Sequence, residues 1–124
     1  MKAGLILFAH GARDPAWAAP FEAVAAAVRR AQPDADVRLA FLELMQPSLP
    51  DAGAALAAAG CTQVAVLPLF LGAGGHVRKD LPVLVEALRS AHPGVTFQLH
   101  GAVGEDEGVI AAMAAAAART LEAA

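Results

Sequence analysis

Four short apolar runs alternate with longer stretches of helical character, and this alternation constrains the fold more than any other feature of the chain. The runs lie at residues 3–9, 36–42, 62–70 and 95–100. Short apolar runs bounded by turn residues are typical of buried strands. Strands that alternate with helices favour a parallel sheet with right-handed crossovers. We therefore predict an α/β fold, (βα)4, with a four-stranded parallel sheet flanked by helices, in a single domain over residues 1–124.

Start and stop signals divide the stretches between these runs. Asp14 and Ser48 are typical N-cap residues, and Gly60 is a typical residue just past a helix end. Pro82 is expected in the first turn of the third helix, where a missing N–H costs little. The alanines near the carboxyl terminus favour a close-packed fourth helix. The predicted helices cover residues 15–31, 48–60, 79 or 80 to 91, and 105–123.

Charge and composition exclude several classes of protein. The net charge is −3, and no cluster of Lys and Arg indicates a nucleic-acid partner. The single cysteine, Cys61, excludes an internal disulfide and agrees with a reducing, cytoplasmic location. The longest apolar run, Val109–Ala118, falls short of the roughly 20 residues that span a membrane. We expect a cytoplasmic protein with neither a membrane segment nor a signal peptide.

Three side chains that can bind metal or protons follow the predicted strands. His10 follows the first strand, Glu43 the second and His76 the third. Ligands of open α/β sheets bind outside the carboxyl ends of the strands. We therefore expect these three residues at one edge of the sheet. A histidine after one strand is usually structural, and Glu43 alone could be a solvent-facing loop residue, so the hypothesis depends on the three together.

Glycines surround both histidines. Gly11 can adopt a positive φ and let a ligand approach the backbone. Gly74 and Gly75 belong to a glycine-rich segment that we expect to be an open, mobile loop. This segment matches neither the P-loop nor the dinucleotide fingerprint, so nucleotide binding is weakly supported.

Positively charged residues lie in the same loops as the two histidines. Arg13, Arg78 and Lys79 either solvate the edge of the sheet or receive an anionic substrate. His100 ends the fourth strand at the same edge, where it can join the site or serve a structural role. Two histidines with one carboxylate are an incomplete ligand set for a structural metal, which normally has four. Such a set suits a metal that is handed on, and imidazole accepts Co, Ni, Fe and Zn.

Three segments together resemble the small sirohydrochlorin cobaltochelatases, the short members of the class II chelatases. They are His-Gly-Ala-Arg-Asp-Pro at residues 10–15, Phe-Leu-Glu at 41–43 followed by Pro47, and Pro-Leu-Phe-Leu-Gly-x-Gly-x-His-x-x-x-Asp-x-Pro at 68–82. The resemblance covers nearly the whole chain in order and spacing. It implies a flavodoxin-like, chelatase-like half that pairs with a second copy as a homodimer.

The resemblance also implies an activity: insertion of a divalent metal into sirohydrochlorin, a tetrapyrrole, without ATP. His10 and His76 would bind the metal, and Glu43 would assist as a third catalytic residue. The metal is a substrate (Co²⁺ first, Fe²⁺ or Ni²⁺ as alternatives), and no permanently bound cofactor is expected. The residues expected to contact the tetrapyrrole are Gly11, Arg13, Gly74, Gly75 and Arg78.

Two other functions stay open at this stage. A histidine phosphatase also places His-Gly after its first strand, but Ala9 stands where such an enzyme has a phosphate-binding arginine. A metal carrier or sensor would bind Co²⁺, Ni²⁺ or Fe²⁺ without any tetrapyrrole.

Overall fold

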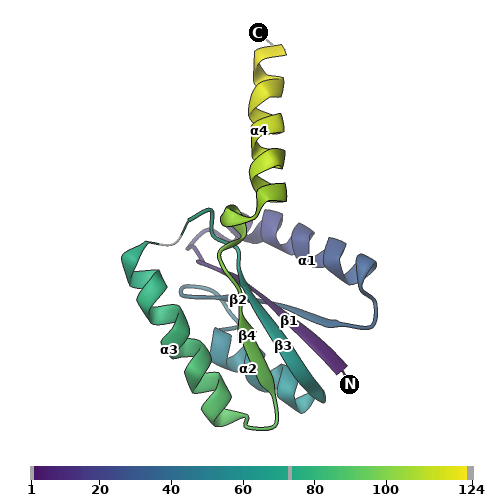
Figure 1. Cartoon of the computed structure of the whole chain (residues 1–124), viewed down its shortest axis with the longest axis vertical. Coiled ribbons are helices and arrows are strands. Elements are labelled where there is room, and N and C mark those ends of the chain that lie inside the picture. The colour runs from purple at the N-terminus through teal and green to yellow at the C-terminus, as the bar shows by residue number, and fades with distance from the viewer. Residues whose placement is uncertain (1, 73, 123–124) are drawn as a thin grey trace.

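A parallel sheet of four strands forms the centre of the molecule (Figure 1). The structure, a computed structural model, describes residues 2–72 and 74–122, except for the side chain of His76. The strand order is β2-β1-β3-β4, and every neighbouring pair is parallel. The predicted α/β sheet is therefore confirmed. The strands are β1 (Lys2–Ala9), β2 (Asp36–Phe41), β3 (Cys61–Pro68) and β4 (Thr96–Leu99).

Helices cover the two faces of the sheet unequally. Helix α1 packs on β2 at one face, while α2 and α3 pack side by side on the other face. Two 3-10 turns precede α1 and α4. The helical elements are η1 (Pro15–Ala18), α1 (Ala19–Ala31), α2 (Leu49–Ala58), α3 (Gly75–Ala91), η2 (Val103–Glu105) and α4 (Glu107–Glu122).

The predicted caps are confirmed. The Asp14 carboxylate accepts a hydrogen bond from the backbone N–H of Ala16 at 2.9 Å, although the first helix opens with a 3-10 turn. The Ser48 hydroxyl accepts one from the N–H of Asp51 at 3.3 Å. Gly60 follows the last turn of α2 with a φ of +91°, a conformation that glycine adopts without strain.

The main core lies between the sheet and the α2–α3 layer. Ile6 and Phe8 of β1 are fully buried, and so is Val66 of β3. Leu56 of α2 and Val85 of α3 complete this cluster from the helical side. A smaller cluster on the other face joins the sheet to α1. Burial on both faces explains why the central strands are continuous apolar runs.

The beginning of the third helix differs from the prediction. Helix α3 begins at Gly75, so Pro82 lies inside the helix and not in its first turn. The expected open loop is therefore largely the first turns of a helix. Pro82 removes one backbone hydrogen bond, but the buried side chains of Leu81, Val85 and Leu88 hold the helix against the sheet on both sides of it.

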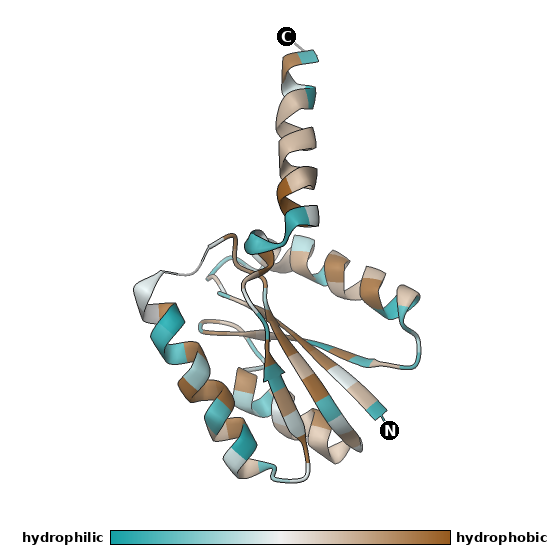
Figure 2. Ribbon diagram, in the orientation of Figure 1, coloured by the Kyte–Doolittle hydropathy of each residue, from teal (hydrophilic) through white to brown (hydrophobic). Residues whose placement is uncertain are grey.

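The fourth helix also departs from expectation. A close-packed helix was predicted, but no described residue of α4 is buried. Figure 1 shows α4 extending away from the rest of the molecule. In Figure 2 most of its surface has apolar or weakly apolar colours. Within residues 2–72 and 74–122, no helix is both long and apolar enough to cross a membrane.

Candidate functional site

Two neighbouring strands end at a histidine and a glutamate that lie close together. His10 directly follows β1, and Glu43 lies two residues beyond β2. The Nε2 atom of His10 is 3.4 Å from the Oε1 atom of Glu43, which makes an ion pair when the imidazole is protonated. About half of each side chain is exposed. The pair is thus open to a ligand at the carboxyl edge of the sheet.

Backbone contacts hold this pair in register. The N–H of Glu43 donates to the carbonyl of His10 at 3.1 Å, and the N–H of Leu42 donates to the carbonyl of Ala9 at 2.9 Å. Gly11 has a φ of +96°, and a Cβ atom there would lie 1.9 Å from the carbonyl oxygen of Glu43. Only glycine therefore lets the two loops approach this closely. The predicted positive φ of Gly11 is confirmed, but the group that lies against its backbone is the carbonyl of Glu43, whereas a ligand was expected there.

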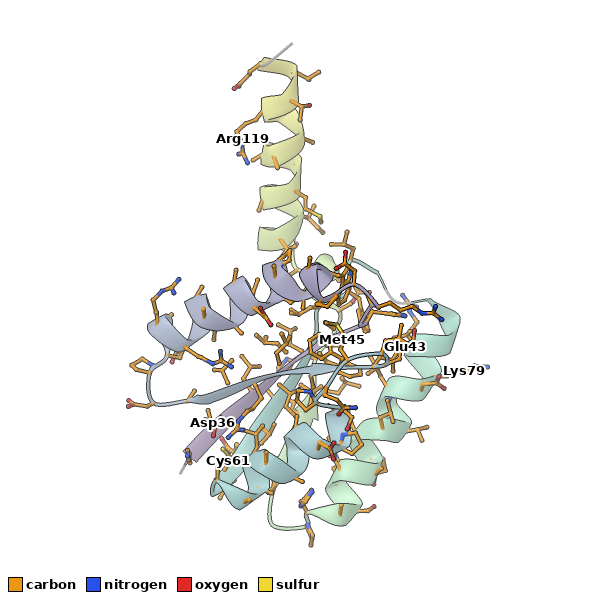
Figure 3. All side chains as sticks on the ribbon, turned by 180° about the vertical axis from the view of Figure 1, so that it is seen from behind. Asp36, Glu43, Met45, Cys61, Lys79 and Arg119 are labelled. Carbon is orange, nitrogen blue, oxygen red and sulfur yellow. The ribbon has the colours of Figure 1, made fainter. Side chains whose placement is uncertain are left out.

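The loop that carries Glu43 is tightly turned. The N–H of Met45 donates to the carbonyl of Glu43 at 2.8 Å, across Leu44. Leu44 has a φ of +65°, which is strained for a side chain of this kind, and it is 60% exposed. Figure 3 shows Glu43 and Met45 far from Asp36 and Cys61, which begin their strands at the opposite edge. Strain of this kind clusters at functional sites.

The aromatic ring of Phe70 lies against His10. Phe70 was not predicted as a residue of the site. The rings of His10 and Phe70 are 6.0 Å apart between centroids, in an edge-on arrangement. Phe70 is 8% exposed and also contacts Phe8 of the core. The position of Phe70, just past β3, was the available signal. This contact restricts the orientation of the His10 imidazole.

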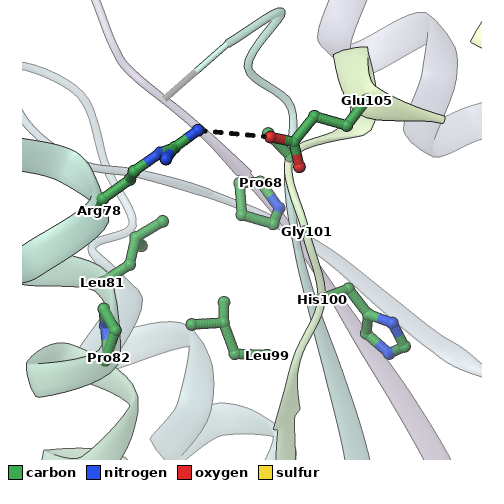
Figure 4. Close-up of a pocket in the computed structure, with 9 residues that line it drawn as sticks. Pro68, Arg78, Leu81, Pro82, Leu99, His100, Gly101 and Glu105 are labelled. Atoms are coloured by element: carbon green, nitrogen blue, oxygen red, sulfur yellow. Dashed lines mark ion pairs between the residues drawn. The ribbon is translucent and has the colours of Figure 1, made fainter. Parts of the chain in front are cut away.

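A separate cavity of about 330 Å³ lies at the same edge, between β4 and α3 (Figure 4). Arg78 and Glu105 border it, and their side chains approach within 3.7 Å. Gly104 holds η2 there, because a Cβ at this position would meet the backbone of Leu71. Glu105 was predicted only as a residue of a helix start, so its place in this cavity was missed.

The remaining residues that were predicted for the site lie either at the cavity beside β4 or on exposed loops and helix starts. Figure 4 shows His100 on the side of β4 opposite Leu99 and Leu81. His100 borders the cavity of about 330 Å³ and a second one of about 340 Å³ on the other side of β4. The residues Arg13, Gly74, Gly75 and Lys79 are exposed. Thus His10, Gly11 and Glu43 are brought together, while Arg78 and His100 lie at the cavity beside β4.

His76 lies in the first turn of α3, which begins near the same edge of the sheet. Its side chain is outside the described part of the structure, so the shared site of His10 and His76 stays a prediction. Among the described side chains, no group of three or more His, Cys, Asp or Glu is placed to hold a metal ion.

The groups with perturbed pKa values lie at the opposite edge of the sheet. A hydrogen bond from Arg38 holds the pKa of Asp36 below its usual value. Burial raises the pKa of the Cys61 thiol. Both residues begin strands, and their shifts follow from local pairing and packing. They therefore belong to the structural frame and not to the candidate site.

Comparisons with known proteins agree on one family. The family model described as CbiX matches residues 4–120. A crystal structure of a CbiX protein from Marinobacter aquaeolei VT8 is 34% identical, covers 98% of this chain and 99% of that one, and superposes with a TM-score of 0.87. The structure of SirB from Bacillus subtilis with Fe³⁺ is 27% identical, with a TM-score of 0.78. That match covers 90% of this chain and 44% of SirB.

One curated relative is named for its enzymatic activity. The sirohydrochlorin cobaltochelatase of Methanosarcina acetivorans is 33% identical over 81 residues. The match covers 65% of this chain and 62% of the relative. This chain thus aligns with less than two thirds of the relative's length.

Proposed function

The chain belongs to the CbiX family, and on that premise we propose that it inserts a divalent metal ion into sirohydrochlorin without ATP. The observation that carries this proposal is the pair of His10 and Glu43 at the carboxyl edge of the sheet, 3.4 Å apart and open to solvent. A metal ligand next to a proton acceptor is the combination that metal insertion requires. The name of the Methanosarcina relative supports the same substrate.

The metal is a substrate that must arrive and leave. In this proposal His10 and His76 hold it through neutral imidazole nitrogens, which accept Co²⁺, Fe²⁺ and Ni²⁺. Two protein ligands leave positions free for the pyrrole nitrogens of the tetrapyrrole. We favour Co²⁺, because the curated relative is a cobaltochelatase. SirB was solved with Fe³⁺ and, in another structure, with cobalt, so iron, as Fe²⁺, is our first alternative.

Proton balance assigns a role to Glu43. All four tetrapyrrole nitrogens bind the inserted metal, and the two that carry N–H groups lose their protons, so two protons leave for each metal inserted. An imidazole nitrogen whose lone pair holds the metal cannot accept a proton at the same time. The Glu43 carboxylate can take up a pyrrole proton or orient the His10 ring, as carboxylates commonly do beside metal-binding histidines.

The surroundings of the pair suit a flat, anionic macrocycle. The exposed loops bear the proposed tetrapyrrole contacts Gly11, Arg13, Gly74 and Gly75, with Lys79 as a further cation. Arg78 already pairs with Glu105 at 3.7 Å. A substrate carboxylate can replace Glu105 there, because charge-assisted bonds to arginine are strong and bidentate.

We further propose that two copies act together as a homodimer. One small α/β domain offers a single wall to a tetrapyrrole. A second copy that faces the first supplies the other wall and shields the metal from water during transfer.

Replacing Glu43 by glutamine should lower kcat for metal insertion about 10- to 100-fold, the usual cost of losing such a carboxylate. The substitution keeps size and shape but removes the negative charge. The dissociation constant for sirohydrochlorin should change by less than about twofold, because the proposed rim cations are untouched. Absorbance changes of the tetrapyrrole measure both quantities under anaerobic conditions. Glu86→Gln is the matched control, since Glu86 is exposed on α3 and pairs with Arg89.

Parent-rate turnover of Glu43→Gln with Co²⁺, Fe²⁺ and Ni²⁺ would remove Glu43 from the mechanism. The same assay separates a chelatase from a metal carrier. A carrier binds metal in proportion to protein and gives no conversion of tetrapyrrole beyond the uncatalysed rate.

A further inference from the structure

Two exposed leucines lie on either side of His10 at the carboxyl edge of the sheet. Leu44 directly follows Glu43, whose carboxylate is 3.4 Å from the His10 imidazole, and Leu44 is 60% exposed. Leu71 directly follows Phe70, whose ring is 6.0 Å from that of His10, and Leu71 is 71% exposed. Because β1 lies between β2 and β3 in the sheet, the two loops border His10 from opposite sides. We call Leu44 and Leu71 the leucine pair.

The backbone holds Leu44 in an unfavourable conformation. Its φ of +65° is uncommon for a residue with a Cβ atom, and asparagine or glycine adopts it more readily. The turn is fixed by the hydrogen bond from the N–H of Met45 to the carbonyl of Glu43, which also lies against Gly11. Leu44 belongs to none of the hydrophobic clusters of the described residues. An apolar side chain at this position therefore adds strain to the fold without a contact in the core.

A different set of contacts fixes Leu71. The N–H of Leu69 donates to the carbonyl of Phe8 at 2.8 Å, which joins this segment to β1. The N–H of Gly104 donates to the carbonyl of Phe70 at 2.9 Å, and a Cβ atom at Gly104 would meet the backbone of Leu71. The loop is thus attached to β1 and to η2. A side chain on an attached loop loses less conformational entropy when a ligand binds to it.

We propose that the leucine pair binds the apolar face of a flat macrocycle and centres that face over His10. In the proposed function this macrocycle is sirohydrochlorin, a ring with apolar faces and an anionic rim, so the assignment rests on that function. Neighbouring strands are about 4.8 Å apart, so the ends of β2 and β3 are about 10 Å apart. This span is comparable with the width of a tetrapyrrole ring. A small anion or a bare metal ion gains nothing from two exposed leucines.

The leucine pair and Glu43 have separable roles. Apolar contact with the ring face is the same before and during metal insertion, so it strengthens binding of the tetrapyrrole without lowering the barrier to insertion. The loss of such a contact raises KM and leaves kcat unchanged. The opposite result is expected for Glu43→Gln, which removes a proton acceptor. The two kinds of residue can therefore be told apart by kinetics.

Titration with metal-free sirohydrochlorin, followed anaerobically by its fluorescence, tests the assignment in the full chain. Leu44→Asn and Leu71→Asn should each raise the dissociation constant about fivefold or more, because each removes apolar area that the ring covers. Turnover at saturating tetrapyrrole should stay within about twofold of the parent rate. Leu44→Met and Leu71→Met keep an apolar side chain and should bind within about twofold of the parent.

The control variant is Val83→Asn. Val83 is 68% exposed on α3, and valine and asparagine have similar helix propensities. Its affinity for sirohydrochlorin should equal that of the parent. Leu44→Asn should unfold at the parent temperature or above, because asparagine tolerates the positive φ. A fall in its unfolding temperature would instead show that Leu44 supports the fold.

Parent-like affinity in either asparagine variant overturns the assignment, as does an equal loss in Val83→Asn. A change of oligomeric state in the leucine variants, measured by light scattering, would show that the pair joins two copies, which also contradicts it. Because binding is measured without metal, weakened binding in the variants of a parent that inserts no metal refutes only the proposed function. Normal turnover with unchanged binding in both leucine variants refutes only the role of the leucine pair.

Discussion

Replacing His10 by alanine should lower the rate of metal insertion by two orders of magnitude or more, within the range that a positioned acid–base or ligand group contributes. The substitution removes a proposed metal ligand and leaves Glu43 without its partner at 3.4 Å. Stability should change little, because about half of the His10 side chain is exposed. Initial rates with sirohydrochlorin and Co²⁺ measure the first effect, and thermal unfolding the second.

His92→Ala is the matched control. His92 ends α3 at the opposite edge of the sheet and packs against Phe97 at 6.2 Å between ring centroids. It should lose some stability and no catalytic rate per folded molecule. If His10→Ala inserts metal as fast as the parent, His10 is not a metal ligand and the proposed site is wrong.

Replacing Gly11 by alanine should impair both the fold and the site. The new Cβ would meet the carbonyl oxygen of Glu43, and the φ of +96° is unfavourable for alanine. The free energy of unfolding should fall by at least about 2 kcal/mol. The two loops must also separate, which moves Glu43 away from His10. We therefore expect a loss of insertion rate of about tenfold or more even where the variant is fully folded.

Urea unfolding measures the stability of Gly11→Ala, and initial rates at low temperature measure its activity. Gly94→Ala is the control, because a Cβ at Gly94 meets nothing within 4 Å and the residue lies at the far edge. Parent-like stability and rate in Gly11→Ala would show that the close approach of the two loops is dispensable.

The sheet and the position of its edge residues could be predicted because each strand is a continuous apolar run. The residues that follow such runs must lie at the carboxyl edge, which brought His10 and Glu43 into one hypothesis. Their contact further requires that β1 and β2 be neighbours, which they are. Strand order is a tertiary property that the runs themselves do not encode.

The start of α3, the pairing of Arg78 with Glu105 and the packing of α4 could not be predicted from sequence patterns, because each depends on tertiary contacts. Pro82 suggested a helix start, but the burial of Leu81 and Val85 outweighs the lost hydrogen bond and lets α3 begin earlier. The pairing of Arg78 with Glu105 joins residues brought together only by the packing of α3 beside β4. The alanines of α4 correctly predicted a helix, but the predicted close packing is not found, because no described residue of α4 is buried.

Multiple turnover tests most directly whether this chain catalyses metal insertion. Sirohydrochlorin in large excess over protein is mixed anaerobically with Co²⁺, Fe²⁺ or Ni²⁺, and the absorbance of the metallated product is followed. We expect a rate that is proportional to protein, saturates with tetrapyrrole and exceeds the protein-free rate with at least one metal. A rate equal to the protein-free rate with all three metals would show that the chain is not a chelatase for these metals.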